Sequence, residues 1–182
     1  MTYKILVITD APFAATGYGN QADKVFSELV KRGYDVYQFA CNYFTTGNEV
    51  YDKDGFLIHN GIKCIVNKKI WENPKDIYPT AQDVRWWFDS IKPDIVFSLN
   101  DFYRVDAYLS LGDDFVSKWV HWLPIDNDMP DEMWPQREKN MKFLVYLTKF
   151  GMEKDGSRVG KIHYMDYIYH AIPNDVFRPV LS

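Results

Sequence analysis

Two glycines near the N-terminus are the first residues whose type and spacing suggest a chemical role. The segment TGYGN, residues 16–20, follows a short apolar run at 4–9 and precedes a helical pattern that ends before Gly33. Glycine lets a backbone approach a ligand closely, and the N–H groups at the amino end of a helix can receive an anion. We therefore predict a phosphate-binding loop formed by Gly17, Tyr18 and Gly19. A tight turn that merely requires positive φ angles is the alternative.

Gly17, Gly19 and Ala22 also match G-x-G-x-x-A, the relaxed dinucleotide-binding pattern. That pattern places its first glycine directly after the strand, whereas seven residues separate Thr9 from Gly17 here. It also requires an acid at the end of the second strand, where this chain has the segment 40–42, ACN. Both differences argue against a nicotinamide cofactor.

Short apolar runs alternate with helical patterns along most of the chain, and this alternation predicts an α/β fold. We expect a single Rossmann-like domain over residues 1–182: a doubly wound, mostly parallel sheet with helices on both faces. Strands are predicted at residues 4–9, 35–40, 63–66, 95–99, 117–123, 143–147 and 165–170. Helices are predicted between 20 and 33 and at 80–91, 105–111, 131–140 and 149–154.

Local signals mark the ends of several predicted elements. Gly33 suits the position just past a helix, and Thr80 and Thr148 suit N-caps. Residues 43–79 interrupt the alternation and are predicted to be an insertion that carries a hairpin, turning either at 52–55 or at 60–61, Asn-Gly.

Composition limits the class of protein. The chain has 182 residues, 47% of them hydrophobic, which is enough for one domain with a substantial core. Its net charge of −4 argues against a broad surface for nucleic acid or anionic membrane, and no apolar run reaches transmembrane length. The two cysteines, Cys41 and Cys64, have no metal-binding spacing, so we expect reduced, partly buried thiols in a cytoplasmic protein.

Four segments, taken in order, resemble the N-terminal lobe of nucleotide-sugar-dependent glycosyltransferases of the GT-B architecture, in particular the retaining family 4. The first is ITDAPFAATGYGNQADKVFSELVKRGYDVYQF at 8–39, with its strand, glycines and helix-to-strand turn. The second is KPDIV at 92–96, and the third is WVHWLPID at 119–126. The fourth is YHAIPNDVFRP at 169–179, and together the segments span essentially the whole chain.

The resemblance implies transfer of a sugar from a nucleotide sugar to an acceptor hydroxyl, with no metal or other cofactor. In that family the C-terminal lobe holds most of the donor, while the N-terminal lobe supplies the acceptor pocket and a glycine loop near the donor phosphates. The second lobe would begin where this sequence stops, at Ser182. We therefore expect the chain to need a C-terminal lobe or a partner subunit, and to have little activity alone.

The resemblance also suggests roles for single residues. His121 is the first catalytic candidate, because an imidazole near a strand end can bind a sugar hydroxyl or stabilise the leaving group. Asp126 is the second, as an acid or base that orients the hydroxyl. Acceptor-binding candidates are Asp101, Tyr103, Arg104 and Trp122.

Each of these residues also has a purely structural interpretation. His121 suits a hydrogen-bonded core histidine, Trp122 suits core packing, and loops such as 100–104 are polar by default. The acidic group Asp126, Asp128, Asp131 and Glu132 is better explained as charge before a helix than as a metal site.

Two other functions stay open. The chain would be a non-catalytic module if it only recognised a glycan, paired with another subunit or formed a homodimer. An exposed apolar surface would favour this alternative. A flavodoxin-like or nucleotide-binding protein would use the glycines for phosphate, but it would need tight binding of a mononucleotide or flavin by this chain alone.

Overall fold

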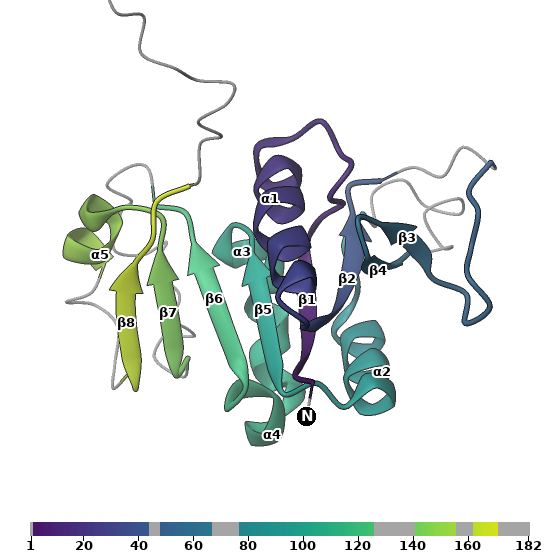
Figure 1. The fold of residues 1–182 in the computed structure, drawn as a ribbon. Helices are drawn as coiled ribbons and strands as arrows, with labels where there is room; N and C mark the ends of the chain where they lie inside the picture. Colours follow the sequence, from purple (N-terminus) through teal and green to yellow (C-terminus); the bar gives the residue numbers. More distant parts are fainter. Residues whose placement is uncertain (1, 44–47, 67–76, 126–140, 156–161, 171–182) are drawn as a thin grey trace, which may run out of the picture.

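The computed structural model describes residues 2–43, 48–66, 77–125, 141–155 and 162–170 (Figure 1). Eight strands form one sheet in the order β3-β4-β2-β1-β5-β6-β7-β8. The strands are β1 Lys4–Asp10, β2 Asp35–Cys41, β3 Leu57–His59, β4 Ile62–Ile65, β5 Ile95–Leu99, β6 Trp119–Leu123, β7 Phe143–Tyr146 and β8 Tyr164–Tyr167. Only β3 and β4 pair antiparallel. The predicted fold class, a mostly parallel Rossmann-like sheet, is confirmed.

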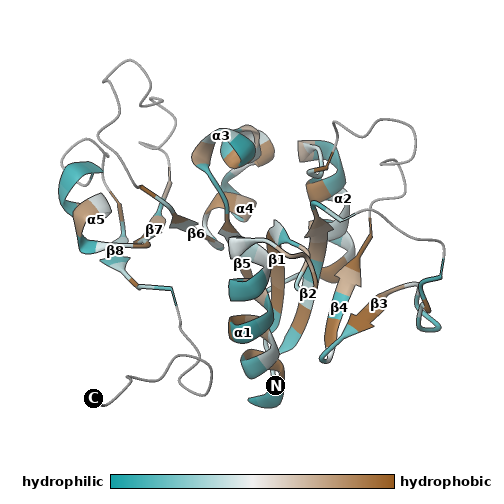
Figure 2. Ribbon diagram, turned by 90° about the horizontal axis from the view of Figure 1, so that it is seen from above, coloured by the Kyte–Doolittle hydropathy of each residue, from teal (hydrophilic) through white to brown (hydrophobic). Residues whose placement is uncertain are grey.

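Helices cover both faces of this sheet, as Figure 2 shows from above. One face carries α1, Gly17–Lys31. The other face carries α2 Ala81–Ile91, α3 Phe102–Val105, the 3₁₀-helix η2 Asp106–Leu111, α4 Asp113–Val116 and α5 Lys149–Asp155. The chain moves from β1 toward one edge of the sheet and later from β5 toward the other. Because parallel crossovers are right-handed, the two directions place their helices on opposite faces.

Alternate residues of the central strand point into two separate cores. Leu6 and Ile8 of β1 join the core beneath α2 to α4, whereas Ile5 and Val7 join the core beneath α1. Helix α1 contributes Ala22 and Phe26 to its core, one helical turn apart. Helix α2 contributes Val84, Phe88 and Ile91 to the other core, with the same helical spacing.

The end signals predicted from sequence are present. Gly33 has φ +91° and donates its N–H to the carbonyl of Val30, while the N–H of Tyr34 reaches Leu29, so α1 ends in a Schellman motif. Thr80 and Asp83 form a reciprocal capping box at the start of α2. The N–H of Gly151 donates to the Thr148 hydroxyl at the start of α5.

Residues 43–79 contain the predicted hairpin, but part of it belongs to the main sheet. Strands β3 and β4 turn at Asn60 and Gly61, which have φ +47° and +83°, and a second turn closes between Asp52 and Gly55. Strand β4 then pairs in parallel with β2. The insertion therefore extends the sheet rather than standing outside it.

Three predicted elements differ from the structure. Helix α1 begins at Gly17, so the glycines form its first turn instead of a loop before it. The predicted loop at 100–104 is shorter, because α3 begins at Phe102. The predicted helix at 105–111 is a 3₁₀-helix over 106–111. The helix predicted at 131–140 lies outside the described residues.

Replacing Thr80 with Ala should destabilise the domain by about 1 kcal/mol, because it removes the hydroxyl that accepts from the Asp83 N–H at the start of α2. Thr80→Ser keeps that hydroxyl and serves as the control. Urea unfolding followed by circular dichroism measures both free energies. Equal stability of the two variants would show that the capping box contributes nothing.

Candidate functional site

The two halves of the sheet meet between β1 and β5, which pair in parallel at its centre. The chain leaves β1 toward α1 and leaves β5 toward α3, on opposite faces of the sheet. Open α/β sheets bind ligands outside the carboxyl ends of their strands at such a switch point. Here the two sides are bridged, because the Tyr18 hydroxyl donates to Asp101 Oδ1 at 3.2 Å. This edge between α1 and α3 is the candidate functional site.

A buried carboxylate, Asp10, organises the site from the last position of β1. Its side chain accepts from the Thr16 hydroxyl at 2.7 Å and from the Tyr78 hydroxyl at 3.0 Å, and the residue is only 3% exposed. Thr16 caps α1, because its Oγ1 in turn accepts from the N–H of Gly19 at 3.0 Å. One carboxylate thus fixes both the amino end of α1 and the position of Tyr78.

Tyr78 is a reliable donor in this arrangement. Burial, followed by the nearby charge of Asp10, raises the pKa of its hydroxyl, so the proton stays on oxygen at neutral pH. Residue 77 reaches the same edge, since its carbonyl accepts from the N–H of Asn42. The end of the 43–79 insertion therefore lies beside the carboxyl ends of β1 and β2.

Two fully buried amides complete the inner side of the site. Gln38 donates from Nε2 to the carbonyl of Asp10 at 2.8 Å, and Asn100 donates from Nδ2 to the carbonyl of Ile8 at 3.1 Å. Their amide oxygens have no hydrogen-bond partner among the described residues. These side chains hold the chain around the switch point in a fixed geometry.

Gly17, Tyr18 and Gly19 lie at this edge but not as predicted. They are helical, and neither glycine has a positive φ, so the expected loop conformation and the tight turn are both wrong, whereas the phosphate-binding role stays a prediction. Gly19 is required for a different reason. A Cβ there would stand 2.6 Å from the carbonyl of Ala14 and 2.7 Å from that of Ala11, whereas a Cβ on Gly17 would meet nothing within 4 Å.

His121 lies in the middle of β6 rather than at its end. Its side chain is fully buried, its Nδ1 is 2.6 Å from the Ser98 hydroxyl, and its ring packs beside Phe102 and Trp119. Burial lowers the pKa of His121 to about 3, so the imidazole is neutral. Ser98 also accepts from Trp119 Nε1 at 2.8 Å. This geometry favours the structural role that the sequence left open.

Trp122 is on the opposite face of β6, because successive strand residues alternate. It is 4% exposed, donates from Nε1 to the carbonyl of Ile168 at 2.9 Å, and meets His170 edge to face at 5.2 Å. Its ring is part of a small core with Leu99 and Val145. Packing against an acceptor is therefore not supported for Trp122.

The other acceptor candidates, unlike Trp122, lie at the edge of the site. Asp101 accepts a hydrogen bond from the Tyr18 hydroxyl, Tyr103 is 66% exposed, and the Arg104 guanidinium lies over the rings of Tyr78 and Tyr103. Asp126, together with the acidic residues that follow it, lies outside the described residues, so its catalytic role stays a prediction. Sequence reasoning missed Asp10, Gln38 and Tyr78. The first two could have been noticed as polar side chains within otherwise apolar strands.

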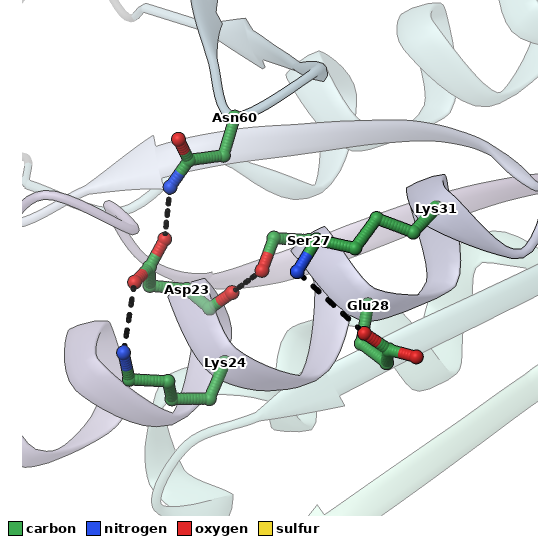
Figure 3. Close-up of a pocket in the computed structure, with 6 residues that line it drawn as sticks. All are labelled: Asp23, Lys24, Ser27, Glu28, Lys31 and Asn60. Atoms are coloured by element: carbon green, nitrogen blue, oxygen red, sulfur yellow. Dashed lines mark hydrogen bonds and ion pairs between the residues drawn. The ribbon is translucent and has the colours of Figure 1, made fainter. Parts of the chain in front are cut away.

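A separate pocket lies between α1 and the β3–β4 turn (Figure 3). Its lining residues are Asp23, Lys24, Ser27, Glu28, Lys31 and Asn60. Asp23 accepts from Asn60 at 2.8 Å and lies 3.0 Å from His59 Nε2, so it ties α1 to the β3–β4 turn. Lys31 is paired with Glu28. Because these charges are already matched, we assign this pocket a structural role.

Within the described ranges, no group of three or more histidine, cysteine, aspartate or glutamate side chains is placed to hold a metal ion. Nor does any described helix combine the length and apolar character needed to cross a membrane. Cys41 and Cys64 are buried and unpaired with each other, and burial raises the pKa of both thiols.

No protein-family model matches the chain, and no curated protein matches it.

The two glycines of α1 should respond in opposite ways to alanine. Gly19→Ala should destabilise the domain by about 1–3 kcal/mol, because backbone carbonyls occupy the space a Cβ needs. Gly17→Ala should be neutral or stabilising by about 0.5 kcal/mol, since the space is open and alanine favours helix. Chemical denaturation of both variants measures this. Comparable losses at both positions would contradict the packing described for Gly19.

His121 should make the fold sensitive to acid. In the unfolded chain a histidine has a pKa near 6.5, so between that value and about 3 the unfolded state binds the extra proton. Stability should therefore decrease as pH falls through this range, by up to about 1.4 kcal/mol per pH unit from this group. His121→Gln should lack that slope in urea unfolding between about pH 7 and pH 4. A wild-type slope no steeper than the variant's would mean that His121 is not buried and neutral.

Proposed function

We propose that this domain is the acceptor-side half of a nucleotide-sugar-dependent glycosyltransferase of the GT-B type. It would help to transfer a sugar from a nucleotide-sugar donor to an acceptor hydroxyl. The observation that supports the proposal is the polar edge between α1 and α3, where Tyr18 and Asp101 meet beside the amino end of a 15-residue helix.

The chemistry requires a stabilised diphosphate leaving group and an oriented acceptor hydroxyl. The amino end of α1 offers backbone N–H groups and the positive end of a helix dipole, which suit a phosphate. Gly17 and Tyr18 would contribute most, because the N–H of Gly19 already donates to Thr16. Asp101 and Arg104 would contact the acceptor from α3 and the loop before it.

Two acidic groups have different expected roles. Asp10 accepts two hydroxyl hydrogen bonds and is almost fully buried, so it supports the site and would not act as the base. Asp126 follows β6 by three positions in the sequence and remains the proposed acid or base. His121 would act at most through Ser98 and Phe102, by positioning the chain around it.

A second function, a non-catalytic assembly module, is favoured by one observation. Large apolar side chains are exposed along and just after the edge strand β8: Tyr164 51%, Met165 40%, Ile168 55% and Tyr169 60%. Large apolar side chains exposed at the edge of a sheet suit contacts with another protein. Concentration-dependent association in analytical ultracentrifugation, without any binding of nucleotide sugars, would favour this alternative.

The isolated chain should bind nucleotide sugars weakly, with a Kd of about 1 mM or higher, and should show little transferase activity. One helix end supplies only part of the contacts that a diphosphate needs. Calorimetric titration with UDP-glucose and GDP-mannose tests the affinity, with Gly19→Ala as the variant that disturbs the amino end of α1. A tight, stoichiometric isotherm from the isolated chain would refute this division of labour between two lobes.

A further inference from the structure

Arg104 differs from the other arginines of the described chain in its partners. Arg32 pairs with Glu28 at 3.2 Å, and Arg85 pairs with Asp89 and with Asp114. The Arg104 guanidinium instead lies 4.7 Å from the centre of the Tyr78 ring and 4.9 Å from that of Tyr103. No carboxylate of the described residues forms an ion pair with it. The guanidinium is therefore held over aromatic rings, and no carboxylate of the described residues neutralises its charge.

The surroundings hold Arg104 in place from two directions. Tyr78 is anchored by its hydrogen bond to the buried Asp10, so the ring is held in position beneath the guanidinium. The backbone N–H of Arg104 donates to the carbonyl of Asp101 at 3.0 Å, which fixes the start of α3. The cation thus belongs to the same edge as the bridge between Asp101 and Tyr18.

The two ring contacts place the guanidinium carbon over aromatic faces, and neither contact uses the N–H donors in a hydrogen bond to an oxygen. Those donors match the paired oxygens of a carboxylate or phosphate, which they bind in a bidentate manner. A guanidinium held in this way loses little conformational freedom when it binds an oxyanion. The geometry at Arg104 is that of a prepared anion receptor.

We propose that Arg104, held by Tyr78 and Tyr103, binds an oxyanion, a phosphate or a carboxylate, carried by the acceptor. That the anion belongs to the acceptor rests on the proposed function, whereas the oxyanion site itself rests on the geometry alone. The acceptor would then be an acidic sugar or a sugar phosphate rather than a neutral one. Binding to an otherwise acidic chain, with net charge −4, would depend on this local positive group and would weaken with salt.

The test is a titration of the ¹⁵N-labelled chain, followed through the Arg104 Nε–Hε signal, which is assigned by its loss in Arg104→Gln. The probes are glucose 6-phosphate, glucuronic acid, neutral glucose and UDP. We expect the two acidic sugars to shift the signal, glucose to leave it unchanged, and Arg104→Gln to weaken acidic-sugar binding about tenfold or more. Binding of UDP should change less than binding of the acidic sugars.

Matched variants separate charge from geometry. Arg85→Gln removes the same charge from a guanidinium that is already paired, and should leave acidic-sugar affinity unchanged. Arg104→Lys keeps the charge but loses the bidentate fork and should bind less tightly than the wild type. Tyr78→Leu removes the supporting ring and should weaken binding, with a melting curve showing that the variant is folded.

Two outcomes would overturn the proposal. If Arg104→Gln and Arg85→Gln weaken acidic sugars equally, the effect is general electrostatics and there is no site at Arg104. If Arg104→Gln weakens UDP alone, the oxyanion belongs to the donor, and the acceptor is not acidic. Neither outcome requires transferase activity, so a failure of the proposed function would be seen separately, as an absence of sugar transfer by the chain when a C-terminal lobe of the proposed type is supplied.

Discussion

The candidate site depends on one buried carboxylate. Removing the charge of Asp10 from water is costly unless hydrogen bonds replace those of the solvent, and two hydroxyl groups do so here. Thr16 is the cap of α1, and Tyr78 supports Arg104. Because all of these contacts share one side chain, the helix end on one side of the switch point and the cation on the other are placed relative to each other.

The sheet explains why polar groups gather at this edge. Within β1, residues from Ile5 to Ile8 are buried between helices on both sides, so only apolar side chains are tolerated there. At the end of the strand the helices diverge to opposite faces, and the backbone groups of Ile8 and Asp10 need partners. Gln38 of β2 and Asn100, which directly follows β5, supply them. The polar edge is thus a consequence of the strand order. Once formed, this edge is available for binding.

His121 shows how a residue type that suits catalysis can serve the fold. A neutral imidazole between Ser98, Phe102 and Trp119 fills a core position, and its Nδ1 has a hydrogen-bond partner in the Ser98 hydroxyl. Its Nε2 has no partner among the described residues, a cost that the surrounding packing must offset. In contrast, Arg104 lies in a segment that reads as an ordinary polar loop. We therefore propose a ligand contact for the exposed residue and not for the buried one.

By itself the sequence determined the local structure: the α/β alternation, the cap at Thr80, the helix end at Gly33 and the turn at Asn60-Gly61. Each depends on residues a few positions apart, whose preferences act without the rest of the chain. Only the tertiary structure decided which side chains form the site. Asp10 and Tyr78 are 68 positions apart, and Tyr18 and Asp101 are 83 apart. Their meeting depends on strand order and on which face each residue takes, and a one-residue shift in a strand reverses that face.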